Sequence, residues 1–169
     1  MSLTFFIVNS RKGVTIMSKN VNVLNLEGAV IGFRNFAGTE GMYNKAGDRN
    51  FVVFLDPEQA KDLEAQGWNI HWPKEREGLA PEDDDRNPYL SVQVAYNRFP
   101  PKVVMITDGN ATHLYEEEVE SLDYVEIESS DLVINPYHWE MNGKSGIKAY
   151  LKAIYVTVAT DAFSSKYGV

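Results

Sequence analysis

The last long apolar stretch of the chain, residues 148–158, begins by alternating strictly between polar and apolar side chains. The two sets are Lys148, Tyr150 and Lys152, and Ala149, Leu151 and Ala153. Successive side chains of a strand point to opposite faces, so this pattern predicts a β-strand whose small apolar face packs in a core. The lysine and tyrosine face suits a partner with charge and flat rings, as single-stranded nucleic acid has. The alternative is a solvated tyrosine between two solubilising lysines.

Length and composition predict an ordinary globular domain. The chain has 169 residues, 44% of them hydrophobic and 24% charged, which favours one domain with a sizeable core. There is no cysteine, so disulfides, thiolate metal ligands and cysteine nucleophiles are excluded. No apolar run approaches the roughly 20 residues that a membrane-spanning helix needs. We expect a cytoplasmic protein.

The net charge of −8 argues against a general nucleic-acid binder, which is usually basic. The acidic residues, however, are concentrated in two short runs, residues 82–85 and 116–120, which we expect to be solvated loops. We also expect the first of these loops to lie away from any binding groove. Residues 34–49 and 144–152 are basic or neutral by comparison, so an acidic chain can still form a local basic groove.

Most of the chain is predicted to be β-structure. Residues 21–36 form a long apolar run interrupted by Gly28 and Gly32, which suits a bent or bulged strand. Asp56-Pro57 predicts the start of a helix that Gly67 ends, and Asn142-Gly143 is a strong hairpin signal. The other predicted strands are residues 49–55, 68–72, 89–97, 102–107, 124–127 and 132–136, with a loop at 73–88 and a turn at 108–110.

This order of elements favours a mainly β fold. We predict an OB-fold-like five-stranded barrel with extra hairpins and one or two short helices, because the long first strand of such a barrel needs bending glycines. A β-sandwich stays open as the alternative. We divide the chain into an N-terminal extension (1–16), a single domain (17–160) and a short tail (161–169). Met17 reads as a second natural start, and the extension is either largely unstructured or an added edge strand.

Three clusters mix cations with aromatic rings, which is the pattern of a surface that follows phosphates and stacks on unpaired bases. They lie in the first hairpin, around the Pro100-Pro101 turn, and along the last hairpin and strand. We expect about half of the aromatic residues in these clusters to belong to the core. The candidate contacts are Arg34, Phe36, Tyr43, Lys45, Arg49, Phe51, Arg98, Phe99, Lys102, Trp139, Lys144, Lys148, Tyr150 and Lys152.

Several of these segments together resemble a family of bacteriophage single-stranded DNA-binding proteins. The matching segments, within residues 22–158, are 33–36, 43–51, 100–104, 135–137, Trp139 and 148–152. The resemblance implies an OB fold and binding of single strands with little sequence preference, in phage DNA replication or recombination. It leaves phage or host replication proteins and a homo-oligomer open as partners. Residues 161–169 contain a single acid, so the resemblance does not extend to an acidic tail.

The patterns for an enzyme are weak. His71, His113 and His138 are widely separated, without the spacing of a helical zinc pair, and no phosphate-binding glycine loop is present. We therefore expect no catalytic residue, cofactor or metal site. Two alternatives stay open: an acidic protein that mimics DNA and blocks a host protein, and a metal-dependent nuclease that uses the carboxylates of residues 83–85.

Overall fold

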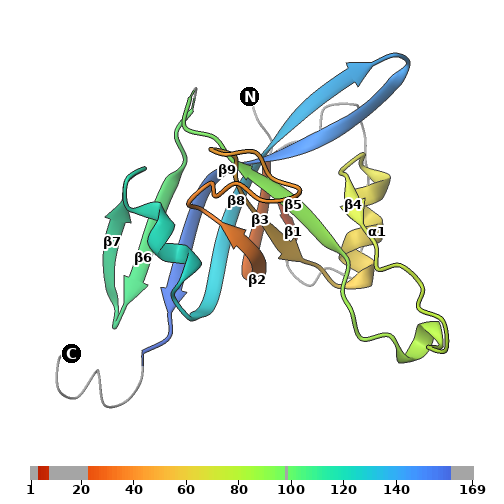
Figure 1. Cartoon of the computed structure of the whole chain (residues 1–169), viewed down its shortest axis with the longest axis horizontal. Coiled ribbons are helices and arrows are strands. Elements are labelled where there is room, and N and C mark those ends of the chain that lie inside the picture. The colour runs from red at the N-terminus through yellow and green to blue at the C-terminus, as the bar shows by residue number, and fades with distance from the viewer. Residues whose placement is uncertain (1–3, 8–22, 98, 161–169) are drawn as a thin grey trace.

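The computed structural model describes residues 4–7, 23–97 and 99–160, and Figure 1 shows their arrangement. These residues form one sheet of nine strands, one α-helix and two short 3-10 helices. The strands are β1 (Thr4–Ile7), β2 (Val23–Asn35), β3 (Arg49–Phe54), β4 (Ile70–His71), β5 (Tyr89–Val94), β6 (Lys102–Thr107), β7 (Asn110–Leu114), β8 (Ile127–Met141) and β9 (Lys144–Val158). The helices are α1 (Pro57–Ala65), η1 (Pro81–Asp83) and η2 (Val119–Asp123).

Five of the strands close into a barrel. Strand β2 pairs with β3, β3 with β5, β5 with β9, β9 with β8, and β8 returns to β2. All these pairs are antiparallel except β5 with β9. This closed mixed ring is the OB-type barrel that the sequence predicted, and its closure excludes the β-sandwich.

The first barrel strand bends where glycine was expected to bend it. Pairing of β2 with β8 shifts between Leu26 and Ala29, and Gly28 between them has a φ of +61°. Pairing of β2 with β3 shifts again between Gly32 and Asn35. Each irregularity turns the strand more sharply than a regular ladder allows, so β2 can pair with different partners along its length.

The interior of the barrel is filled by alternate side chains of its strands. Residues on β3 and β5 show the pattern most clearly, because Phe51, Val53, Leu90 and Val92 are at most 1% exposed. The same alternation holds at the start of β9, where Ala149, Leu151 and Ala153 are buried and Lys148 and Lys152 are exposed. The predicted two-faced strand is therefore confirmed, and Tyr150 projects from the outer face of the barrel.

Additions to the barrel lie at both edges of the sheet. Helix α1 begins as expected at Asp56 with a capping box, in which its carboxylate accepts the N–H of Gln59 at 2.8 Å. At the other edge, β6 pairs in parallel with β9 and forms a hairpin with β7, a strand that the sequence pattern did not predict. Of predicted strand 68–72, only Ile70 and His71 are in a strand, β4.

Predicted strand 132–136 is part of a longer strand, β8, which starts at Ile127 and so includes only the last residue of predicted strand 124–127. The polar residues between them stay in the ladder because β8 has partners on both sides, β2 and β9. Ser130 is buried there, and the Asp131 carboxylate accepts the N–H of Gly28 at 2.9 Å. Pairing on both sides thus keeps the polar residues 128–131 within the strand.

Near the N-terminus, Thr4–Ile7 pair in parallel with Val23–Leu26, as the edge-strand alternative predicted. The rest of the predicted extension, Met17 and the predicted tail at 161–169 lie outside the described residues. Within the described part of the chain, no helix is long and apolar enough to cross a membrane.

Candidate nucleic-acid interface

The most prominent surface feature is the far half of the β8–β9 hairpin, which projects beyond the barrel (Figure 1). We call residues 137–148 the arm. In it, β8 pairs with β9 alone, from Tyr137 with Lys148 to Met141 with Lys144. The predicted Asn142-Gly143 turn closes it, with φ values of +53° and +78°. Positive φ at both central residues is the requirement of the tight hairpin turn that keeps long strands twisted together.

The two faces of the arm differ in chemistry. Cross-strand partners project to the same side of a ladder, and successive residues alternate. One face, which we call the arm face, therefore carries three large side chains and two lysines. Its members are Tyr137, Trp139, Met141, Lys144 and Lys148. Glu140 and His138 project from the opposite face. The only carboxylate of the arm is thus kept away from the arm face.

Trp139 is seated on a glycine. It pairs with Gly146, and a Cβ atom added to Gly146 would lie 2.9 Å from the indole ring. Any side chain at position 146 would therefore displace the ring. The indole is 36% exposed, so it is held against the backbone of the neighbouring strand and still presents surface to solvent.

Tyr150 lies where the arm meets the barrel. Its ring makes an edge-on contact with Tyr137, with centroids 5.8 Å apart and planes at 76°. Both rings line a groove of about 630 Å³, the neutral groove, whose described lining residues include no charged side chain. Its lining residues are Ala95, Asn97, Phe99, Asn135, Pro136, Tyr137, Tyr150 and Leu151.

A second groove, of about 410 Å³, opens on the other side of Tyr150. The end of the first hairpin loop, the end of β5 and Glu116 form its walls. Asp48, Arg49 and Glu116 give this groove charges of both signs. Tyr150 therefore separates a neutral groove from a charged one, and it is the residue common to both that carries an aromatic ring.

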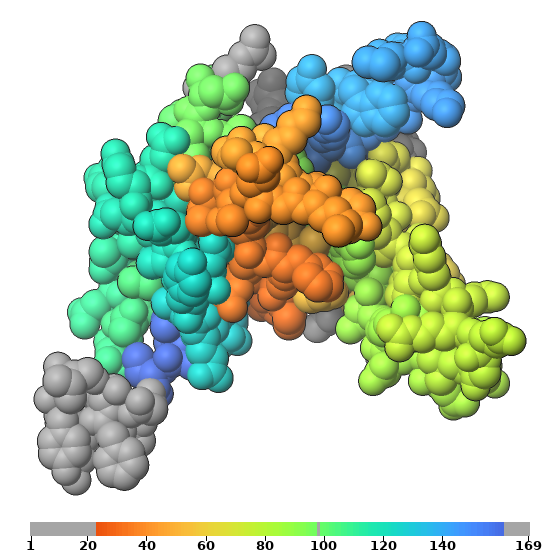
Figure 2. Space-filling view, in the orientation of Figure 1, coloured from red at the N-terminus to blue at the C-terminus, as the bar shows by residue number. Residues whose placement is uncertain are grey.

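The loop between β2 and β3, residues 36–48, covers one side of this region, between the arm and the segment around η2 (Figure 2). Amide side chains hold it. Asn35 donates to the carbonyl oxygen of Thr39 at 3.0 Å, and Asn44 donates to Thr39, Lys45 and Asp48 carbonyls at 2.9 to 3.1 Å. Predicted contacts Tyr43 and Lys45 are exposed here, Tyr43 at 96%.

Two predicted contacts in the first hairpin are wrong, and a third has a structural role. Phe36 and Phe51 are fully buried and stack on each other with centroids 5.2 Å apart, so neither ring can reach a ligand. They fill the barrel because both lie on its inner face. Arg34 is half-buried, and its Nη1 donates to the carbonyl oxygens of Leu122 and Val125 at 2.6 and 2.8 Å. It joins β2 to η2 instead of facing a phosphate.

Arg49 is only partly available. Its Nη1 donates to the Phe36 carbonyl oxygen, its guanidinium lies 5.6 Å from the centre of the Tyr96 ring, and Nη2 is 3.7 Å from Glu116. The arginine therefore connects β3 to the Phe36 backbone, to Tyr96 and to Glu116 while lining the charged groove. Burial raises the pKa of Tyr96 to about 12, against the opposing effect of the Arg49 cation.

The remaining predicted residues are spread over the same side and beyond it. Phe99 is 81% exposed in the neutral groove, and Arg98 lies outside the described residues. Lys152 is exposed two residues after Tyr150. Lys102 belongs to β6, where its Nζ lies 5.6 Å from the ring centre of Tyr155. The β8–β9 ladder thus places Trp139, Lys144, Lys148 and Tyr150 on one face of the hairpin, whereas Lys102 lies on the neighbouring strand β6, where it pairs with Ala153 of β9.

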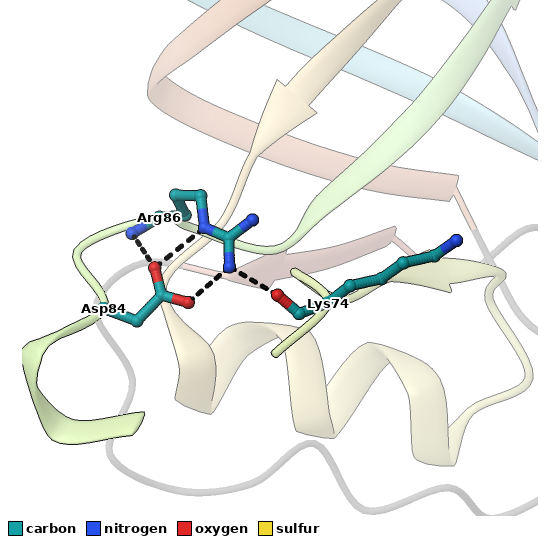
Figure 3. A network of polar contacts seen from close by, with 3 residues as sticks. All are labelled: Lys74, Asp84 and Arg86. Atoms are coloured by element: carbon teal, nitrogen blue, oxygen red, sulfur yellow. Dashed lines mark hydrogen bonds and ion pairs between the residues drawn. The ribbon is translucent and has the colours of Figure 1, made fainter. Parts of the chain in front are cut away.

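The acidic loop expected at residues 73–88 lies away from the arm (Figure 1) and lines neither groove. Within it the Asp84 carboxylate accepts from Nε and Nη2 of Arg86 at 2.9 and 2.7 Å, and Arg86 also donates to the Lys74 carbonyl oxygen (Figure 3). These hydrogen bonds lower the pKa of Asp84 to about 2. In the part of the chain that is described, no group of three or more His, Asp or Glu side chains could hold a metal ion.

Sequence reasoning missed a second group of aromatic residues. Phe33, Phe54, Tyr89 and His71 meet on the outer face of β2, β3, β5 and β4. Tyr89 could have been found, because it alternates with buried residues of β5. Phe33 could not, because its direction depends on the irregular pairing of β2.

A closed five-stranded barrel with aromatic and basic side chains on its outer face has the architecture of oligonucleotide-binding domains. Sequence comparison places the chain within this class: a family model described as "Putative phage ssDNA-binding domain" matches residues 14–169. The chain therefore belongs to this family of phage ssDNA-binding domains. A search of curated protein sequences finds no match.

Two solved structures share the fold. Both are of the single-stranded DNA-binding protein from bacteriophage Enc34, one a C-terminal truncation and one in complex with ssDNA. Each has a TM-score of 0.50 and 11% sequence identity. The first likeness covers 81% of this chain and 86% of that chain, and the second 82% and 88%. At this identity the likeness concerns the fold alone.

Proposed function

We propose that this protein binds single-stranded DNA with little sequence preference and acts without catalysing a reaction. The observation that carries the proposal is the position of Tyr150, an outward-facing ring between two grooves at the base of the arm. Base stacking on such rings tolerates any sequence, because every base has a flat face. The family to which the chain belongs and the structure of the Enc34 protein in complex with ssDNA support the same ligand.

The distribution of charge supports this ligand. None of the described residues that line the neutral groove has a carboxylate, and Lys144 and Lys148 lie on the face of the arm that leads into it. A phosphate backbone can therefore approach Tyr150 along a path that has lysines and no acid, although the chain as a whole is acidic. Aromatic rings at Tyr137, Trp139 and Phe99 lie along the same path.

The biological setting follows from this binding activity. The protein would cover and protect single strands during phage DNA replication or recombination, in the cytoplasm of the host cell. Phage or host replication proteins, or further copies of the chain, are the partners to look for in that setting. The absence of catalysis belongs to the proposal as well, because stacking and phosphate binding require no reacting group.

The direct test is a fluorescence-anisotropy titration of labelled oligothymidylate, with a duplex of equal length as the control. We expect saturable binding of the single strand and much weaker binding of the duplex. A DNA mimic would bind neither, and a nuclease would shorten the labelled strand when magnesium or manganese is added. Either of these results would contradict the proposal.

Substitution of Tyr150 tests the site. Tyr150→Ala should weaken single-strand binding by about 1–3 kcal/mol, the contribution of one stacked base. Its melting temperature should stay close to that of the wild type, because the ring lies outside the barrel core. Tyr124→Ala is a matched control, since Tyr124 is 83% exposed and lines neither groove. Equal affinities of wild type and Tyr150→Ala would show that the DNA binds elsewhere.

A further inference from the structure

The second aromatic group, which we call the aromatic patch, is built around Phe33. This residue has a φ of +44°, a left-handed conformation that is unusual for a bulky side chain and costs conformational energy. The ring is nevertheless 72% exposed, so burial of the ring does not compensate for the strain. Its centroid lies 6.0 Å from that of Phe54 and 6.1 Å from that of Tyr89, both in tilted or edge-on contacts. The unusual backbone thus lays an exposed ring across two neighbouring strands.

The rings beneath Phe33 are themselves held in place. Phe54 lies against Gly32, where an added Cβ atom would be 2.5 Å from the ring. Tyr89 is stacked on His71 with centroids 4.9 Å apart and planes at 12°. Phe54 on Gly32 repeats the arrangement of Trp139 on Gly146, so each of the two aromatic surfaces has a ring seated on a glycine. Both surfaces are pre-organised to accept a flat partner without first ordering their side chains.

The aromatic patch is continuous with the surface around Tyr150. Tyr150 of β9 pairs with Gln93 of β5. Tyr89 lies on β5 four residues before Gln93, and half-buried Ser91 stands between Tyr89 and Gln93 on the same face of that strand. Four residues of strand span about 13 Å, which is about four nucleotides at the spacing of a stacked strand. A single strand seated at Tyr150 can therefore reach Phe33 with a few nucleotides.

The side chains that the connecting strands direct outward include no acid, although Asp48 and Glu116 line the groove beside Gln93. The outward residues of β3 and β5 are Asn50, Val52, Phe54, Tyr89, Ser91 and Gln93, none of which is charged. The chain has 24 acidic and 16 basic residues, so a strip without carboxylates stands out. A polyanion requires such a strip because carboxylates would repel it, whereas an ordinary protein partner has no such requirement. Amide side chains on the strip can in addition hydrogen-bond to base edges.

We propose that the aromatic patch is a second base-stacking subsite, in which Phe33 receives a base of the same single strand that Tyr150 binds. The inference rests on the proposed function. It assigns to the protein a binding surface of two parts, which only oligonucleotides long enough to span both can fill. Because the outward side chains of the strip include no cation, stacking at Phe33 adds affinity with little added salt dependence.

The test is a set of anisotropy titrations with two labelled oligothymidylates. One has about 2 nucleotides, too few to span the distance from Tyr150 to the aromatic patch, and the other has about 16, the upper limit of site size for one OB fold. Phe33→Leu keeps an apolar side chain at the strained position and removes only the ring. We expect affinity for the longer strand to fall roughly 5- to 100-fold, the loss of one stacked base. Affinity for the shorter strand, held at Tyr150, should change by less than about 2-fold. Tyr124→Leu is the matched control and should bind both strands like the wild type.

Each result has a distinct meaning. If Phe33→Leu binds the longer strand like the wild type while Tyr150→Ala binds it weakly, the second subsite is wrong and the proposed function stands. If the wild-type protein binds neither strand, the proposed function itself fails. If Phe33→Leu leaves DNA binding intact and Phe33→Asp turns a dimer into a monomer in sedimentation, the aromatic patch joins copies of the chain instead. Should Phe33→Leu not fold, Tyr89→Leu gives the same comparison from the supporting ring.

Discussion

Tyr96, at the edge of the interface, has a pKa that is set by the burial of its hydroxyl. Its ring lies under the Arg49 guanidinium, and its hydroxyl is buried with no hydrogen-bond partner among the described residues. Burial disfavours the charged phenolate, so the pKa rises from 10.0 to about 12. An unpaired buried hydroxyl contributes nothing to stability, and removing it should be neutral or stabilising.

We therefore predict that Tyr96→Phe is as stable as the wild type, or more so, at neutral pH. At high pH the two should diverge. The raised pKa means that, between about pH 10 and about pH 12, Tyr96 stays protonated in the folded state and loses its proton in the unfolded state. The contribution of this proton to the free energy of unfolding is therefore fully present below about pH 10 and is lost as pH rises toward about 12. Phenylalanine has no such proton, and chemical denaturation across this range should show a smaller loss for the variant. Parallel pH profiles would mean that the Tyr96 hydroxyl is solvated.

The arm illustrates how a pair of strands sorts its side chains. The alternation of β8 and β9, together with a two-residue turn, places rings and lysines on one face and Glu140 on the other. Gly146 matters because Trp139 lies directly across it. The position of the indole is thus set by the partner strand and by the lack of a side chain there.

We predict that Gly146→Val displaces Trp139 and weakens single-strand binding by about 1 kcal/mol or more, at the lower end of the value for a stacked base. Because both changes remove the same contact, Gly146→Val combined with Trp139→Ala should bind like Trp139→Ala alone in a double-mutant cycle. Ser145→Val is the matched control, since Ser145 pairs with Glu140 on the opposite face. Additive losses would indicate that Trp139 does not depend on Gly146.

At the scale of the whole molecule, the question is how a protein of charge −8 binds a polyanion. Its acid lies in segments such as residues 82–85, away from the arm, while Lys144 and Lys148 lie on the arm face. Few lysines are available to neutralise phosphates, so rings, rather than charges, must supply most of the affinity.

We predict a shallow salt dependence. Each neutralised phosphate contributes about 0.7 to the slope of log affinity against log salt, so two or three lysines give a slope of only about 1.5–2. Lys148→Gln should reduce that slope by about 0.7. Lys61→Gln, an exposed change on helix α1, should leave it unaltered. An affinity independent of salt would show that the lysines of the arm do not contact phosphates.

Local interactions along the chain were enough to predict much of this protein. Alternation at residues 148–153 indicated the two faces of β9, glycines indicated the bends of β2, and Asn142-Gly143 indicated the arm turn, because each depends on neighbouring residues only. The same local reasoning selected Tyr150 and Lys148 and kept the acidic run at residues 82–85 outside the grooves.

Which aromatic rings enter the core was decided by tertiary structure. Phe33 and Phe36 are three residues apart in the long predicted strand 21–36, yet one is 72% exposed and the other is fully buried. The difference arises where β2 shifts its register against β3 and Phe33 takes a positive φ. Likewise, Arg34 could not be recognised as structural, since its partners Leu122 and Val125 are distant in the chain. Burial and hydrogen-bond partners depend on how the barrel closes, and closure joins strands whose pairing no local pattern specifies.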